Sequence, residues 1–251
     1  MTPRHCPPTV APDSVPTWEW ARGELAGDRD VLLYARLADW LPERSGDGSL
    51  RQLLGRDWSC FLELSKREVS ARVAATRALL RHASANLADD PTGPLELGYG
   101  PTGRPYLRGH PRVDISLSYV DDLVLIGMTT RGLIGIEAER LDRDLYRSGR
   151  SRHICSPYEL VTLAEVAEGD RNRHLVRLCA LKVAYSKAMG LGAHSRLADI
   201  GFGPDGRPAR ARRPDGTPAA GDEWTFRSFV VDGDYLLGAA VYDAGPGPGR
   251  E

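Results

Sequence analysis

The chain has 251 residues, of which 41% are hydrophobic and 27% are charged, and its formal net charge is −1. This composition is typical of a soluble globular protein with one large or two ordinary domains, and the charge gives no reason to expect nucleic acid or an anionic membrane as a partner. No apolar run in the sequence approaches the roughly 20 residues that cross a bilayer, and four cysteines are widely spaced. We therefore expect a cytoplasmic protein with reduced thiols that binds neither nucleic acid nor membrane.

The first half of the chain predicts a strand, a helix and a pair of strands. Residues 1–17 contain five prolines, which indicates a flexible tail. A strand is expected within 18–34, and apolar residues recur at helical spacing over 65–86. The strand pair is predicted at 113–118 and 123–129.

The second half predicts a similar order of elements. A strand spans the join between the halves at 132–139. Ser156 and Pro157 have the residue types of a helix N-cap and first position, and a longer helix over 170–189 ends at two glycines. The remaining predictions are strands at 224–230 and 235–242, a loop at 205–222 and a flexible tail at 244–251.

An internal repeat suggests a duplicated architecture. The segment 98–105 (GYGPTGRP) returns at 201–208 as GFGPDGRP, each time between a helical segment and a strand pair. The alternative is that this is only a favoured turn sequence. We predict an α+β fold of two similar halves, 18–132 and 133–243, related by pseudo-twofold symmetry, each a small, mainly antiparallel sheet with packed helices. We expect a monomer, because such halves supply an interface within one chain.

Two carboxylates in the central strand are candidate metal ligands. Glu137 and Glu139 are two residues apart in the strand, so their side chains project to the same side. Carboxylates so close repel each other unless a cation lies between them, and Mg²⁺ suits such a pair. The alternative is two solvated acids on an edge strand, but the apolar residues before them favour a buried strand end.

Basic residues elsewhere are candidate phosphate ligands. Lys182 and Lys187 on the long helix could bind a pyrophosphate or extend to solvent. Val183 shares a helix face with Lys187, where a metal site would want another acid. Arg72 and Arg104 are further candidates, and Gly103 would let a backbone approach a ligand closely.

An ordered series of segments resembles the Sfp-type 4′-phosphopantetheinyl transferases, which move the phosphopantetheine arm of coenzyme A to a carrier-protein serine. The segments are 74–81, 103–106, 114–118, 135–139 and 182–191. The resemblance implies two pseudo-symmetric α+β halves with the coenzyme between them. It implies that Arg72 meets the 3′-phosphate and that Glu139 binds Mg²⁺. It further implies coenzyme contacts from Gly103, Arg104, Pro105, Ser118, Lys182 and Lys187.

The departures from this family lie where the chemistry would occur. Glu137 replaces an aspartate, Tyr119 replaces a histidine after Ser118, and Cys179 replaces a tryptophan. Val183 replaces a glutamate that binds the metal and in some members activates the acceptor serine. A missing general base typically lowers the rate by ~10²–10⁴.

Three hypotheses follow from these departures. The first is a repurposed enzyme of a biosynthetic pathway that acts on a pantetheine-linked or small-molecule substrate. Its candidate catalytic residues are Tyr119, Glu137, Glu139, Lys182 and Tyr185, with Mg²⁺ on Glu137 and Glu139. The second is a functional 4′-phosphopantetheinyl transferase that acts on an acyl or peptidyl carrier protein. The third is a non-catalytic protein that binds such a carrier.

Overall fold

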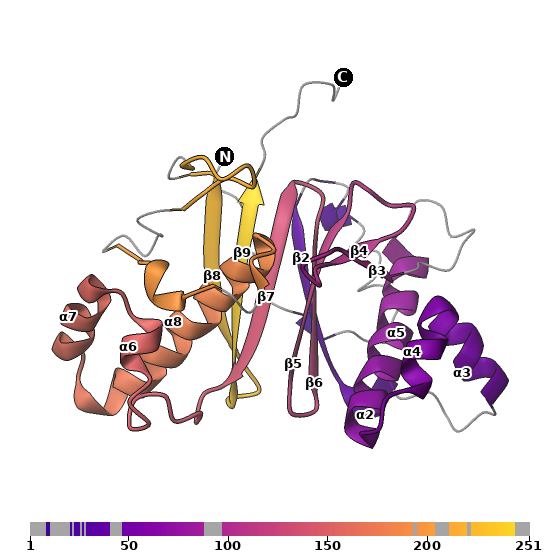
Figure 1. Ribbon diagram of the computed structural model, residues 1–251, viewed down its shortest axis with the longest axis horizontal. Helices are drawn as coiled ribbons and strands as arrows, with labels where there is room; N and C mark the ends of the chain where they lie inside the picture. The colour runs from indigo at the N-terminus through magenta and orange to yellow at the C-terminus, as the bar shows by residue number, and fades with distance from the viewer. Residues whose placement is uncertain are drawn as a thin grey trace.

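The computed structural model describes residues 9–10, 21, 23–25, 27, 29–40, 47–87, 97–192, 195–203, 211–219 and 222–243. These ranges combine helices with mainly antiparallel sheets, which confirms the α+β prediction (Figure 1). In the described ranges no helix is long and apolar enough to cross a membrane. The second copy of the repeat lies largely outside them, at 204–208.

The first sheet has the strand order β1-β2-β6-β5. Its strands are β1 (Thr9–Val10), β2 (Asp30–Arg36), β6 (Leu123–Thr129) and β5 (Asp114–Val120). Within the flexible tail predicted over 1–17, the structure describes β1, whose two β-branched residues pair in parallel with β2. The rest of that tail lies outside the described residues, as does the tail at 244–251.

Helix α5 (Arg67–Leu87) covers one face of this sheet, close to the helix predicted at 65–86. Its buried residues Leu79, Leu80 and Ala83 share a core with β2, β5 and β6. Smaller elements complete this half of the chain: α2 (Leu37–Trp40), α3 (Asp47–Leu54), a 3₁₀ turn (Gly55–Asp57), α4 (Trp58–Leu62) and the hairpin of β3 (Leu97–Tyr99) and β4 (Pro105–Leu107).

The second sheet is antiparallel with the order β7-β9-β8. Its strands are β7 (Gly132–Arg140), β9 (Tyr235–Asp243) and β8 (Trp224–Val231). Helix α8 (Glu168–Ala188) lies directly against it. A Cβ atom at Gly135 would lie only 1.8 Å from the carbonyl oxygen of Ala184, so a glycine is needed for this close approach.

Two shorter helices precede α8. Helix α7 (Pro157–Glu165) begins as predicted, because the Ser156 side chain accepts from the Glu159 amide and the Glu159 carboxylate accepts from the Ser156 amide. Helix α6 (Ser151–Ile154) lies just before it, and a 3₁₀ turn (Leu197–Asp199) follows α8.

The two sheets pack against each other between the two long helices. Leu123 and Leu125 of β6 share a core cluster with Ile134 and Ile136 of β7. All seven residues of β6 are buried, since α5 covers one of its faces and the second sheet covers the other. Figure 1 shows the resulting layers, with α5 and α8 on opposite outer sides of the strands.

Strands β5 and β7 lie side by side, each at the edge of its own sheet. Three backbone amides of β7 donate to side chains of β5 across this junction. The pairs are Ile134 to Asp114 (2.7 Å), Ile136 to Ser116 (3.1 Å) and Ala138 to Ser118 (3.1 Å). We call these three contacts the β5–β7 junction.

Candidate active site

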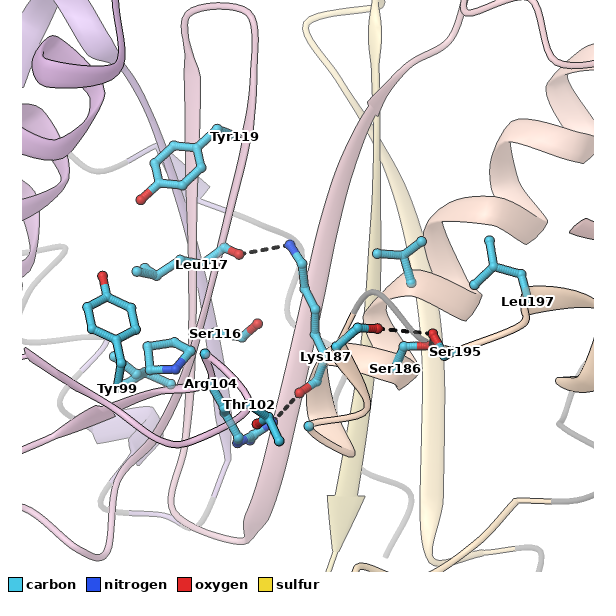
Figure 2. A pocket seen from close by; sticks show the side chains of 16 residues that line it. Tyr99, Thr102, Arg104, Ser116, Leu117, Tyr119, Ser186, Lys187, Ser195 and Leu197 are labelled. Carbon is cyan, nitrogen blue, oxygen red and sulfur yellow. Dashed lines mark hydrogen bonds between the residues drawn. The ribbon is translucent and has the colours of Figure 1, made fainter. Parts of the chain in front are cut away.

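A cavity of about 560 Å³ lies between the two halves of the chain, a volume in the usual range for small-molecule sites (Figure 2). One wall comes from the β3–β4 hairpin and β5, and the other comes from the end of α8 and the segment after it. The lining residues with polar side chains are Tyr99, Thr102, Arg104, Ser116, Tyr119, Ser186, Lys187 and Ser195.

Lys187 extends from the last turn of α8 into this cavity. Its Nζ atom lies 2.5 Å from Glu137 Oε2 and donates to the carbonyl oxygen of Leu117 at 2.9 Å. Ser118 donates to the same Glu137 oxygen at 2.8 Å. Figure 2 shows the lysine reaching across the gap toward Leu117 of β5. The ammonium and the carboxylate therefore balance each other at the cavity wall.

Arg104 lines the cavity, but its guanidinium is engaged with the protein. It donates to the carbonyl oxygens of Lys187 and Ala188 at the C-terminal end of α8, and it pairs with Asp114. Exposed carbonyls at a helix end attract such a cation. These bonds hold the Arg104 guanidinium against the end of α8. Gly103 and Pro105, for which coenzyme contacts are also predicted, line the cavity beside it.

Glu139 lies one step further along the same face of β7. Arg143 donates to its Oε1 atom, and the Cys179 sulfur lies 3.8 Å from that atom. Burial raises the pKa of the Glu139 carboxyl, and the contact with Arg143 opposes this rise. Burial, reinforced by Glu139, raises the pKa of the Cys179 thiol to about 12, so the thiol stays protonated at neutral pH.

One face of α8 runs along both carboxylates. Cys179, Val183 and Lys187 are spaced four residues apart and share that face. Cys179 contacts Glu139, Lys187 contacts Glu137, and Val183 lines the cavity between them. The apolar side chain therefore occupies the place where a third acid would meet the pair.

These residues do not fit the Mg²⁺ ion that the family resemblance implies. Glu137 and Glu139 each pair with a cation of the protein, Lys187 and Arg143 respectively. The described part of the chain contains no group of three His, Cys, Asp or Glu side chains that could hold a metal ion. The Val183 side chain offers no oxygen, so the site lacks the third carboxylate that the resemblance implies, and the two that remain are already paired with cations.

The prediction that Lys182 faces the same site as Lys187 is wrong. Lys182 is fully buried and pairs with Glu159 at 2.6 Å, and it also donates to the carbonyl oxygen of Ile154 at 2.6 Å. Five residues along a helix correspond to a turn of about 140°, which puts the two lysines on different faces. Burial lowers the pKa of Lys182, while Glu159 acts in the opposite direction.

Tyr185 is also separated from the cavity. Its ring packs against Trp224, at 4.8 Å between ring centroids, and Phe226, at 6.1 Å. Its hydroxyl oxygen accepts from the Arg212 amide at 2.9 Å. The structure therefore does not bring Tyr185, a predicted catalytic residue, to the cavity, because its side chain packs in the aromatic cluster under β8.

Tyr119 of β5 is brought to the cavity, whereas Arg72 of α5 is not. Tyr119 lines the cavity, and its hydroxyl is 3.1 Å from the Thr76 hydroxyl. Burial raises the pKa of this phenol, so it remains a neutral donor. Arg72 donates to the carbonyl oxygen of Asp121 at 3.5 Å and is not among the residues that line the cavity.

Sequence reasoning missed two residues that organise the site, Arg143 and Asp114, and a third, Glu159, that holds Lys182 away from it. Arg143 follows Glu139 by four residues, and Glu159 follows Ser156 by three, the spacing of a capping box. Asp114 was part of a recognised segment, but its pairing with Arg104 had no local signal. Comparisons of the chain with models of protein families and with curated proteins find no match.

Proposed function

We propose that this protein has the fold of the 4′-phosphopantetheinyl transferases with a remodelled active site, and that it acts on a pantetheine-linked or other small-molecule substrate in a biosynthetic pathway. The cavity between the halves carries this proposal, because it lies where the resemblance puts the coenzyme and is bordered by Gly103, Tyr119 and Lys187. The remodelling concerns the acid–base and metal groups, not the cavity itself.

The order of elements supports two halves related by pseudo-twofold symmetry. A strand, a long helix and a hairpin follow one another as β2, α5, β5 and β6, and again as β7, α8, β8 and β9. Strand β2 pairs with β6 and strand β7 pairs with β9, and the other strand of each hairpin, β5 or β8, lies beyond. Asp121 and Asp232 begin the two hairpin turns, both with positive φ. The shared order favours duplication over a chance turn sequence.

The position of Val183 argues against phosphopantetheine transfer. A carrier serine needs a base, and no carboxylate stands at this position of α8. Glu137 and Glu139 are both held by cations, so neither is free to bind Mg²⁺ and a pyrophosphate together. Loss of the base alone would lower the rate by ~10²–10⁴.

The cavity offers groups for a different proton-transfer reaction. Lys187 is an ammonium donor with Glu137 as its counter-ion, and Tyr119 is a neutral phenol on the other side. A substrate carbonyl that enters between them would accept a hydrogen bond from Lys187, which stabilises negative charge on its oxygen. Cyclisation and isomerisation of a carbonyl compound both develop such charge.

The transfer reaction itself provides the first test. The protein is incubated with an apo carrier protein, coenzyme A and Mg²⁺, and the carrier is weighed by mass spectrometry beside a sample treated with an active transferase. We expect no added arm on the carrier. Addition at an ordinary turnover of ~10 s⁻¹ would refute the proposal and establish a functional transferase.

Ligand binding provides the second test. Calorimetry with pantetheine and with coenzyme A should detect binding that Lys187→Met weakens about tenfold, the usual size of a lost charged hydrogen bond. The control is Lys66→Met, which changes an exposed lysine before α5. Binding of a carrier protein without either small ligand would instead favour a non-catalytic carrier-binding protein.

A further inference from the structure

Two carboxylates lie on the face of β7 that α8 covers, and each of them is paired with one cation of the protein. Lys187 Nζ lies 2.5 Å from Glu137, and Arg143 donates to Glu139. The formal charge of these four groups therefore sums to zero. A divalent cation placed on the carboxylates would have to displace at least one of these partners, or it would leave two excess positive charges in a partly buried site.

Arg143 is held in place by helix α8. The side chain of Asn172 donates to the Arg143 carbonyl oxygen at 3.0 Å. Its amide oxygen accepts from the backbone amides of Leu145 and Tyr146, at 2.9 and 3.1 Å. One asparagine thus fastens the segment after β7 to the same helix that carries Lys187. The arginine is therefore positioned by backbone contacts, and not only by its attraction to Glu139.

We propose that Arg143 and Lys187 take the place of a divalent cation at the carboxylate pair of Glu137 and Glu139, which makes this a metal-independent site. The neighbouring side chains agree with this assignment. Val183 is apolar, Cys179 is directed at Glu139 as a thiol, and Ser118 donates to Glu137. The inference goes beyond the proposed function, since it concerns the charge balance of the site whatever its ligand is.

Titration with Mn²⁺, followed by electron paramagnetic resonance, tests this without coenzyme or carrier protein. For the wild type we expect a dissociation constant above about 1 mM, weaker than ordinary carboxylate sites. Arg143→Ala frees Glu139 and should tighten Mn²⁺ binding at least tenfold, and Glu139→Gln added to it should remove the gain. Arg147→Ala is the matched control, because it removes an exposed arginine of the same segment.

Two outcomes would overturn the inference. One is wild-type Mn²⁺ binding with a dissociation constant below about 0.1 mM that Glu139→Gln abolishes. The other is a folded Arg143→Ala variant that binds Mn²⁺ no better than Arg147→Ala. Circular dichroism establishes folding, and Arg143→Gln replaces the alanine variant if the latter is unfolded. Neither outcome depends on whether the cavity binds pantetheine, so failure here is distinct from failure of the proposed function.

Discussion

Helix α8 carries two lysine–carboxylate pairs that serve different purposes. The side chains of Lys182 and Glu159 are 0% and 3% exposed, whereas those of Lys187 and Glu137 are 34% and 18% exposed. The first pair joins α7 to α8 in the core, whereas Lys187 of the second pair lines the cavity. The two lysines of this helix therefore have different roles, because their side chains leave the helix axis in different directions. Lys182 supports the fold, and Lys187 lines the cavity.

The carboxylate of the buried pair accepts from two backbone amides, whereas that of the cavity pair accepts from the hydroxyl of Ser118. Glu159 accepts from the amides of Ser156 and Phe202 in addition to Lys182, so the carboxylate joins α7, α8 and the segment after α8. A buried charge pair of this kind adds little net stability, but removing one partner leaves the other uncompensated. The cavity pair can instead exchange its bonds with water or a ligand.

The largest expected effect comes from breaking the buried pair. Lys182→Met should lower the free energy of unfolding by about 3–5 kcal/mol, because Glu159 would remain as an unpaired buried charge. Urea denaturation followed by circular dichroism measures this. The double variant with Glu159→Gln should be more stable than Lys182→Met alone, and a double variant that is less stable would contradict the assignment.

A second variant tests the close contact that brings Lys187 to Glu137. Gly135→Ala would put a Cβ atom against backbone atoms of Ala184 and Ala188, so α8 must move away from β7. We expect a loss of about 1–3 kcal/mol by thermal denaturation, typical of overpacking. Gly169 lies in α8, where an added Cβ atom meets no neighbour, so Gly169→Ala should raise the free energy of unfolding by about 0.5–1 kcal/mol. Equal effects would contradict the contact.

Two buried thiols, Cys179 beside Glu139 and Cys155 near Glu159, predict a dependence of stability on alkaline pH. Burial raises the pKa of Cys179 to about 12 and that of Cys155, near Glu159, to about 11. The protonated thiol contributes stability below its unfolded pKa of about 8.5, and this contribution is lost as pH rises from there through the folded pKa, by at most ~1.4 kcal/mol per pH unit. The free energy of unfolding, measured from roughly pH 8 to roughly pH 11, should therefore fall less steeply with pH in Cys179→Ala than in the wild type. Cys155→Ala should change the slope over a narrower range, and unchanged slopes in both would refute this.

The smallest expected effect on stability comes from the cavity pair. Lys187→Met should change the free energy of unfolding by less than about 1 kcal/mol, because water can replace the lysine at Glu137. Chemical denaturation beside Lys182→Met gives the comparison directly. If both variants lost the same stability, Lys187 would be a structural residue and the division between the pairs would fail.

Local sequence patterns predicted much of the fold. The helix expected at 65–86 is α5 (Arg67–Leu87), and the strand expected at 123–129 is β6 (Leu123–Thr129). These elements have apolar periodicity along their own length, and the start of α7 has a capping signal within four residues. Such information is contained in each segment alone.

The site was harder to predict, because its residues are defined by contacts between distant segments. Lys182 and Lys187 look alike in sequence, and only packing against α7 and β7 separates them. Arg104 was a candidate phosphate ligand until its contacts at the end of α8, more than 80 residues away, were known. Helical periodicity indicates that the two lysines diverge, but not which of them faces the cavity.

The β5–β7 junction also affects whether copies of this protein can pair through the edges of their sheets. Outward-pointing amides at a sheet border are a template on which a foreign strand can add. Here the carboxylate of Asp114 and the hydroxyls of Ser116 and Ser118 occupy three of those amides on β7. Because these short polar side chains already accept from the amides, a strand of another copy cannot pair with them and extend the sheet as in a fibril. The two sheets of the protein stay separate.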